Sequence, residues 1–226
     1  MPTRVKICGL TRLEDAQRAV DLGAAALGFN FYPLSPRHIE PRAARAIVCQ
    51  LPPFVTVVGV FANETDAGHV ISVARQTGAT AVQIHGPAFP ALHELLSVFP
   101  LVVAVAVGQG FKPEELDKIK PSAYLLDSYD PVRLGGTGRA FDWNAACAAK
   151  QYGRIILAGG LTPANVAQAV REVRPFAVDV ASGVESAPGI KDPAKLQAFF
   201  AAVAEADSEP ELADADSRPP HPARPG

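Results

Sequence analysis

The sequence predicts a single (β/α)8 barrel, an α/β fold, and three observations support this class. Short apolar and β-branched runs alternate eight times with longer segments whose apolar residues lie three and four positions apart. The 226 residues suit one such domain, because these barrels commonly use about 200 to 250 residues around one core. Runs such as VTVVGVF and LVVAVAV are apolar on both faces, which is typical of parallel strands covered on both sides.

The first four strand–helix units follow this scheme in order. Their predicted strands end near glycine, asparagine or histidine and are Arg4–Ile7, Ala25–Phe29, Val55–Phe61 and Ala81–Ile84. Their predicted helices carry the helical apolar spacing and are Leu13–Leu22, Pro41–Gln50, Glu64–Thr77 and Pro90–Phe99. Thr11 has the residue type and position of an N-cap for the first helix.

The last four units complete the ring. Their predicted strands are Leu101–Val105, Ala123–Leu126, Arg154–Ala158 and Ala177–Val180, and their predicted helices are Pro113–Lys118, Trp143–Tyr152, Pro163–Val173 and Asp192–Ala206. Thr162 and Asp192 are predicted N-caps, and Pro163 and Pro193 are predicted to occupy first helical positions. We therefore assign the barrel to residues 1–206.

Two questions concern the chain as a whole. An open doubly wound sheet is the main competing fold, but the turn after the first strand reads CGLTR and lacks the GxGxxG fingerprint. Residues 207–226 contain five prolines, five acidic residues and no aromatic residue, so we predict a disordered tail. A short acidic docking segment is the functional alternative for this tail.

Composition excludes several classes of protein. Apolar residues make up 48% of the chain and charged residues 19%, with a net charge of −2, so we expect no nucleic-acid or membrane-surface partner. The longest apolar run is too short to span a bilayer. Cys8, Cys49 and Cys147 lack the spacing of a metal site or a disulfide framework, which favours thiols in the cytoplasm. We interpret Cys49 and Cys147, on predicted helices, as packing residues.

Candidate catalytic residues lie where strands end, because barrel active sites lie at the carboxyl ends of the strands. Cys8 ends the first predicted strand and Asp127 ends the sixth, so the two face each other across the ring as an acid–base pair. Cysteine is often only a small buried hydrophobe, and Asp127 is also compatible with a loop-capping role. Lys6 lies on the same strand face as Cys8 and either lowers the thiol pKa or forms an ion pair in the barrel floor.

Candidate binding residues lie in the loops. Phosphate sites on barrels commonly use backbone N–H groups in the loops after strands seven and eight, where glycine lets the main chain approach the ligand. The loop after strand seven contains Gly159 and Gly160, and the loop after strand eight contains Ser182 and Gly183. Either pair alone is compatible with an ordinary turn. Arg37 offers a planar fork for a carboxylate, or is simply solvated. Gly136 and Gly138 belong to a flexible segment suited to closing over substrate. His85 and Asp179 lie at the ends of predicted strands. His85 is a candidate for the pocket lining, and a purely structural role is an equally good interpretation of it.

The motifs together resemble the phosphoribosylanthranilate isomerase family of tryptophan biosynthesis. From Val5 to Asp192 they read, in family order, VKICGLTR, GFNFYPLSPRHI, GVFAN, VQIHG, LLDS, GGTGRAFDW, LAGGLTPANV and VDVASGVESAPGIKD. The resemblance implies an Amadori rearrangement of N-(5′-phosphoribosyl)anthranilate without a metal or organic cofactor. It implies Asp127 as general acid on the ring oxygen, Cys8 as base at C2′ and Arg37 as the anthranilate carboxylate site. It further implies Asp179 near the ribose hydroxyls and the glycine loops at the phosphate.

The sequence departs from the family pattern at one position, and three competing functions share some of its features. Ala181 stands where the family commonly has a second serine, so a hydroxyl contact to phosphate is missing there. A histidine-pathway aminoaldose isomerase uses paired aspartates, and Cys8 argues against it. A phosphosugar-binding protein without activity is the second competitor, and a Schiff-base aldolase that uses Lys6 is the third. The helix faces are compatible with a monomer or a homodimer.

Overall fold

The structure is a computed structural model of the chain. It describes residues 1–86, 92–108, 110–128 and 143–209. Gly136 and Gly138 and the tail from residue 210 onward lie outside the described residues. Among the segments that are described, no helix has the length and apolar character needed to cross a membrane.

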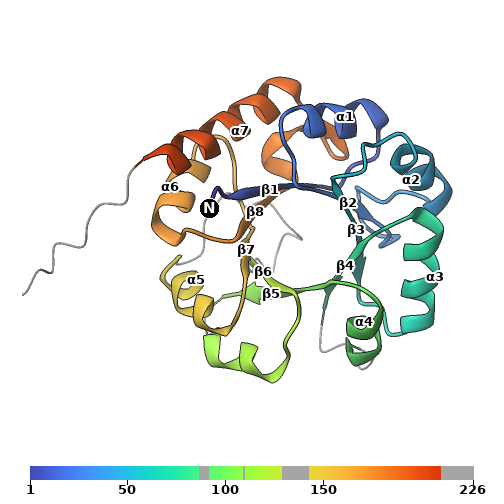
Figure 1. The fold of residues 1–226 in the computed structure, drawn as a ribbon, viewed down its shortest axis with the longest axis horizontal. Helices are drawn as coiled ribbons and strands as arrows, with labels where there is room; N and C mark the ends of the chain where they lie inside the picture. Colours follow the sequence, from blue (N-terminus) through green and yellow to red (C-terminus); the bar gives the residue numbers. More distant parts are fainter. Residues whose placement is uncertain (87–91, 109, 129–142, 210–226) are drawn as a thin grey trace, which may run out of the picture.

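Eight parallel strands form a closed barrel, which confirms the predicted fold (Figure 1). They are β1 (Arg4–Cys8), β2 (Ala26–Asn30), β3 (Thr56–Ala62), β4 (Ala81–His85), β5 (Leu101–Val107), β6 (Ala123–Ser128), β7 (Ile155–Leu157) and β8 (Ala177–Val180). Each strand pairs with its sequence neighbours, and β1 closes the ring on β8 with Lys6 opposite Asp179. The order places β1 and β6 three positions apart by the shorter way round.

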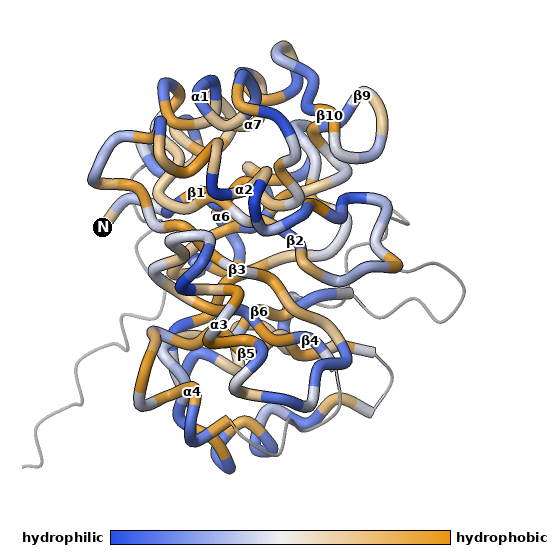
Figure 2. Tube along the Cα trace, turned by 90° about the vertical axis from the view of Figure 1, so that its right-hand side faces the viewer, coloured by the Kyte–Doolittle hydropathy of each residue, from blue (hydrophilic) through white to orange (hydrophobic). Residues whose placement is uncertain are grey.

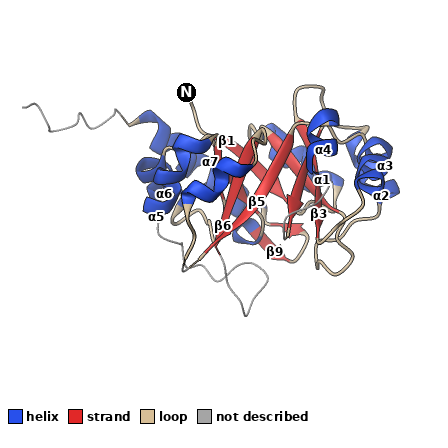
Figure 3. Ribbon diagram, turned by 90° about the horizontal axis from the view of Figure 1, so that it is seen from below, coloured by secondary structure: helices blue, strands red, loops and turns tan. Residues whose placement is uncertain are grey.

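Helices surround this ring (Figures 1 and 3). They are α1 (Leu13–Asp21), α2 (Pro41–Val48), α3 (Ala67–Thr77), α4 (Leu92–Val98), α5 (Trp143–Ala149), α6 (Val166–Val173) and α7 (Pro193–Ser208), with 3-10 turns η1 (Pro113–Lys118), η2 (Lys150–Tyr152) and η3 (Ser182–Val184). A short hairpin of β9 (Glu185–Ala187) and β10 (Ile190–Lys191) follows η3. In Figure 3, β9 lies at the end of the barrel opposite the N-terminus.

The core has an outer and an inner layer. The large outer cluster lies between strands and helices, and smaller clusters fill the interior, one around Leu125 and Ile156 and another around Val58 and Val60 with Cys8 against it. Apolar colouring follows the strands in Figure 2, whereas the hydrophilic segments gather on helices and outer loops. Alternation along each strand therefore sends one set of side chains toward the helices and the other into the barrel.

Several helix starts differ from the prediction. Thr11 does not cap α1, because its hydroxyl donates to the Gly189 carbonyl at 2.7 Å instead. Thr162 and Pro163 do not begin α6, because the Asn165 side chain accepts from Thr162 N–H at 2.7 Å and donates to the Gly160 carbonyl at 3.0 Å. These local bonds hold a turn that competes with the helix. The capping role of Asp192 is confirmed by bonds from two backbone N–H groups.

Further corrections concern the fifth helix, two thiols and the last helix. The segment Pro113–Lys118 is helical with the predicted bounds, but it is a 3-10 helix, a type that is used in short pieces. Cys49 and Cys147 are exposed rather than packed. The last helix continues past the predicted end at Ala206 as far as Ser208, and the Asp207 carboxylate accepts bonds from Thr3 N–H and Oγ1 at 2.6 and 2.7 Å.

Candidate active site

A cavity of about 160 Å³ opens among the carboxyl ends of the strands. Its lining includes most of the predicted site residues, namely Cys8, Arg37, His85, Asp127, Gly159, Gly160, Asp179 and Ser182. They come from β1, β4, β6 and β8 and from the loops after β2, β7 and β8. Barrel closure thus gathers residues that lie far apart in the sequence, as the position rule for this fold predicts.

Cys8 and Lys6 share the inward face of β1. The Lys6 ammonium is buried and lies 2.8 Å from Asp179 Oδ1 on the neighbouring strand β8. This ion pair is the structural role that the sequence left open for Lys6, and the same ammonium also faces the Cys8 thiol. Burial alone lowers the pKa of Lys6, but Asp179 and Cys8 outweigh it, so the pKa lies above its ordinary value and Lys6 is charged.

Opposing influences act on the Cys8 thiol. Burial raises its pKa and is the largest influence, Lys6 lowers it, Asp179 raises it and Lys191 lowers it slightly. The pKa of Cys8 therefore lies above the ordinary thiol value despite the adjacent cation. The sequence led us to expect that a cation would activate the thiol, and the structure adds that burial opposes this effect.

Asp127 lies near the end of β6, one residue before its last residue, Ser128. It is partly buried and lines the same cavity as Cys8. Because β1 and β6 stand three strands apart, these two side chains occupy different walls of the cavity. A small ligand between them is within reach of two groups that exchange protons.

Arg37 is held rather than solvated. Its Nε contacts both carboxylate oxygens of Glu185 at 2.8 and 3.1 Å, and its Nη2 lies 2.7 Å from Oε2. Gly9, directly after Cys8, makes room for the arginine stem: a Cβ at that position would lie 2.5 Å from Arg37 Cδ, and its φ of 73° also favours glycine. Close packing against Arg37 thus explains why a glycine follows Cys8.

His85 lies at the end of β4, and its Nε2 is 2.6 Å from Gln83 Nε2. Burial and the Lys6 ammonium lower the pKa of His85 to about 4, with Asp179 opposing the shift, so the ring is neutral near pH 7. Gln83 lines the cavity, and its buried Oε1 has no hydrogen-bond partner in the described part of the chain. Gln83 lies in the VQIHG motif, but nothing in that motif predicts its place in the cavity wall.

The glycine loops after β7 and β8 lie against each other. Gly159 and Gly160 have φ values of 80° and 67°, and Ser182 begins η3. Gly183 does not line the cavity itself but supports it: a Cβ there would lie 1.9 Å from the Leu161 carbonyl oxygen. The two loops therefore form one wall made largely of main chain, which is suited to an anion.

Comparison with known proteins gives this geometry its context. A sequence profile of N-(5′-phosphoribosyl)anthranilate (PRA) isomerase matches residues 5–202, which is most of the chain. The chain belongs to the PRA isomerase family. A PRA isomerase of Citrifermentans bemidjiense is 52% identical over 199 residues, covering 88% of this chain and 96% of that protein.

Solved structures of PRA isomerases share the fold. The Thermotoga maritima structure aligns with a TM-score of 0.84 at 40% identity, covering 90% of this chain and 99% of that one. Another PRA isomerase, solved with reduced 1-(o-carboxyphenylamino)-1-deoxyribulose 5-phosphate, aligns with a TM-score of 0.80 at 38% identity and the same coverage. The family and the barrel are thus established by sequence and by structure.

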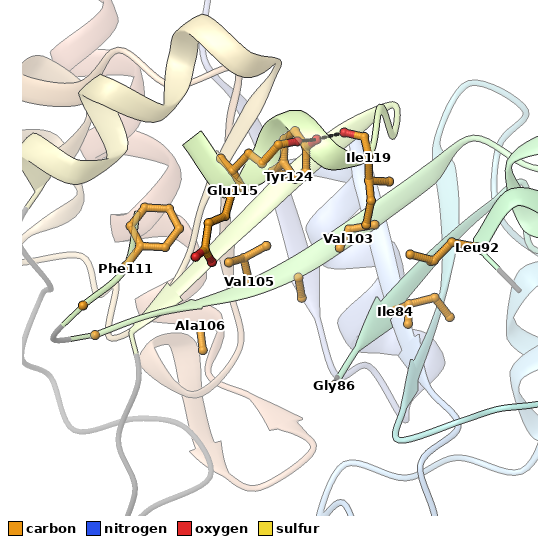
Figure 4. A pocket seen from close by; sticks show the side chains of 14 residues that line it. Ile84, Gly86, Leu92, Val103, Val105, Ala106, Phe111, Glu115, Ile119 and Tyr124 are labelled. Carbon is orange, nitrogen blue, oxygen red and sulfur yellow. Dashed lines mark hydrogen bonds between the residues drawn. The ribbon is translucent and has the colours of Figure 1, made fainter. Parts of the chain in front are cut away.

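A second cavity of about 570 Å³ lies on the outer side of the barrel (Figure 4). Outward side chains of β5, including Val103 and Val105, form its floor, and Glu115 of η1 reaches over them. None of the residues to which the resemblance assigns a catalytic or binding role lines it, although Ile84 and Gly86 of the VQIHG motif do. We attribute it to the short η1, which covers β5 less completely than a full helix would.

Glu185 and Lys191 are the main residues that sequence reasoning missed. Both belong to the SGVESAPGIKD motif, but nothing in that motif announces contacts with Arg37 and Cys8. The contacts depend on the β9–β10 hairpin, which turns the chain back toward β1. No cluster of metal-ligating side chains occurs within the described ranges.

Proposed function

We propose that the chain isomerises N-(5′-phosphoribosyl)anthranilate to 1-(2-carboxyphenylamino)-1-deoxyribulose 5-phosphate by acid–base catalysis between Asp127 and Cys8. Membership of the PRA isomerase family supports the reaction. The observation that supports these roles is the placement of Cys8 and Asp127 in one cavity, three strands apart. The ligand in the related complex carries a carboxylate, a sugar chain and a phosphate, and the lining of this cavity includes an arginine, an aspartate and a main-chain wall as separate contacts for them.

In the first step the Asp127 carboxyl group donates its proton to the furanose ring oxygen. The C1′–O4′ bond breaks, the nitrogen lone pair forms the C=N bond, and an open-chain Schiff base results. The Cys8 thiolate then removes the C2′ proton, which gives the enolamine. Protonation at C1′ and loss of the 2′-hydroxyl proton give the ketone and restore both side chains, so the product is an isomer of the substrate.

The remaining residues hold the substrate. Arg37, fixed on Glu185, offers its free guanidinium edge to the anthranilate carboxylate. The main-chain wall of Gly159, Gly160 and Ser182 faces the phosphate, and backbone donors there do not depend on a hydroxyl at position 181. Asp179, which keeps one oxygen for Lys6, lines the part of the cavity that suits the ribose hydroxyls.

The decisive experiment is turnover of freshly generated substrate by the wild type, Cys8→Ser and Asp127→Asn. We expect each variant to lower kcat by at least about 100-fold, because acid–base groups contribute 10²- to 10⁴-fold. Cys49→Ser and Asp21→Asn are matched controls on exposed positions and should retain wild-type rates. A folded Cys8→Ser variant with near-normal turnover would remove the base assignment, and turnover of the histidine-pathway aminoaldose instead would redirect the function.

Location and assembly are expectations of the same proposal. Three separated cysteines favour a reducing compartment, so we expect the enzyme to act in the cytoplasm as a monomer or homodimer. Sedimentation velocity over a range of protein concentrations distinguishes the two assembly states.

A further inference from the structure

Three charged side chains form a buried row beside the cavity: Arg37, Glu185 and Lys191. Their side chains are 19%, 5% and 0% exposed, so Lys191 has no contact with solvent. Burying charges is costly unless each is paired and hydrogen-bonded, and a buried ion pair is often no more stabilising than apolar side chains of similar volume. The row therefore calls for a reason other than stability.

Lys191 uses its ammonium group on three partners. Its Nζ donates to the Cys8 carbonyl at 2.6 Å, to the Ala181 carbonyl at 3.2 Å and to Glu185 Oε1 at 2.8 Å. These bonds tie the end of β1 to the turn after β8, the two segments that carry the proposed base and part of the phosphate wall. The backbone N–H of Lys191 is itself fixed by the buried Asp15 of α1 at 2.9 Å.

Glu185 joins this lysine to the substrate-facing arginine. Its carboxylate accepts bonds from Arg37 Nε and Nη2, from Lys191 Nζ and from the Gly189 backbone N–H at 3.3 Å. A guanidinium has five N–H donors, and no bond among the described residues uses Arg37 Nη1. The carboxylate thus occupies one edge of the guanidinium and leaves another edge for a ligand.

We propose that Glu185 and Lys191 are positioning residues: Glu185 orients Arg37 toward the substrate carboxylate, and Lys191 holds the Cys8 end of β1 at the reacting carbon. This inference rests on the proposed function, because it needs Arg37 and Cys8 to contact the substrate. Neither Glu185 nor Lys191 touches the substrate in this scheme, and both act through their neighbours.

Separate kinetic effects are expected from the two residues. Glu185→Gln should raise KM about tenfold with less than about a threefold change in kcat, since a binding contact made equally in ground and transition states acts on KM. Lys191→Met should lower kcat about tenfold with little change in KM, because a small displacement of a reacting group acts on the chemical step. Glu14→Gln, in an exposed ion pair with Arg12, is the matched control and should resemble the wild type.

A double variant distinguishes positioning from a general loss of structure. If Glu185 acts through Arg37, Glu185→Gln should add less than about a twofold change to the KM of Arg37→Ala, because coupled residues are not additive. Full additivity of the two effects would overturn the proposal for Glu185. The Glu185→Gln variant leaves the Lys191 charge buried without its partner and is at risk of folding poorly. The double variant Glu185→Gln/Lys191→Met removes the charges of both residues and should still show the raised KM.

Binding provides a readout that does not require turnover. The probes are reduced 1-(o-carboxyphenylamino)-1-deoxyribulose 5-phosphate and the same compound without its carboxyl group, titrated calorimetrically. Glu185→Gln should weaken binding of the first about tenfold and leave the second unchanged. Equal losses for both probes would show a merely structural role and overturn the inference. A wild type that binds the first probe but does not turn over substrate would instead contradict the proposed function.

Discussion

At the scale of single residues, burial and a neighbouring cation act in opposite directions on the pKa of the Cys8 thiol. Burial raises its pKa most, and the Lys6 ammonium, held on Asp179, opposes that rise. A thiol with a raised pKa is a stronger base once ionised, but a smaller share of it is ionised near neutral pH. Lys6 therefore sets how much of the base is available without touching the substrate.

Removal of the Lys6 charge is expected to shift the pH dependence of the reaction. Without this cation the thiolate is less stable, so Lys6→Met should move the acid limb of kcat/KM and the pH midpoint of Cys8 alkylation upward. Iodoacetamide labelling in a Cys49→Ser/Cys147→Ser background measures the midpoint directly, because the two removed thiols are exposed. Lys118→Met, at an exposed position of η1, is the control. An unshifted midpoint in Lys6→Met would exclude the proposed influence of Lys6 on Cys8.

His85 should make the fold sensitive to acid. Its pKa is lowered from 6.5 to about 4, so below pH 6.5 the unfolded chain binds a proton that the folded chain does not. Stability contributed by the neutral ring is then lost as the pH falls from 6.5 to about 4, by at most roughly 3 kcal/mol at about 1.4 kcal/mol per pKa unit.

Urea unfolding at pH 7 and pH 4.5 tests this expectation. His85→Asn should lose less stability than the wild type over that range, whereas His93→Asn, at an exposed position on α4, should follow the wild type. Parallel losses in the wild type and His85→Asn would contradict the assigned shift.

At the scale of elements, the loops after β7 and β8 act as one unit. The close approach of Gly183 to the Leu161 carbonyl leaves no space for a side chain, and the Asn165 bonds stiffen the neighbouring turn. The anion-facing surface is therefore formed by the backbone, and its shape depends on how closely the two loops meet.

Gly183→Ala is expected to separate these loops. The added methyl group cannot share space with the Leu161 oxygen, and such overpacking typically costs about 1 to 3 kcal/mol. We expect a loss of that size in urea unfolding and weaker calorimetric binding of inorganic phosphate. Gly68→Ala, whose nearest neighbour is a side-chain oxygen at 3.2 Å, is the control for both measurements. If Gly183→Ala bound phosphate with wild-type affinity, anion binding would not depend on the contact between the two loops.

The elements also show how far the sequence alone could lead. Strand patterns placed Cys8, Asp127 and Asp179 correctly, because a parallel strand covered on both sides has a clear apolar signature and its end has a fixed meaning in a barrel. Thr11 misled us because a hydroxyl that suits an N-cap found a long-range partner in Gly189. The roles of Glu185 and Lys191 could not be predicted from the sequence, because their contacts with Arg37 and Cys8 form only when the β9–β10 hairpin packs against the barrel.

At the scale of the whole molecule, the outer layer of the barrel is uneven. An α-helix of seven to 16 residues follows each of the other strands, whereas β5 is followed by the six-residue 3-10 helix η1. The middle of β5 is partly exposed, whereas the middle of β2 is buried. Among the described elements, the covering layer is therefore thinnest over β5, where the larger cavity lies (Figure 4).

Hydrogen exchange should reveal this asymmetry. Amides of residues 103–106 in β5 should exchange at least about tenfold faster than those of residues 27–29 in β2, because weakly covered segments open locally at lower free energy. Mass spectrometry of the native protein measures both segments in one experiment. Equal protection would mean that the strand ladder, rather than the covering layer, controls opening.

The β9–β10 hairpin has a consequence for how such a barrel can change over time. Loops at the mouth of a barrel are commonly regarded as interchangeable modules, each belonging to its own strand. Here the last loop is bound to Thr11 through Gly189, to Asp15 and Cys8 through Lys191, and to Arg37 through Glu185. Transplanting it into another barrel would carry only half of a set of interlocking contacts, so its partner segments would have to be moved with it.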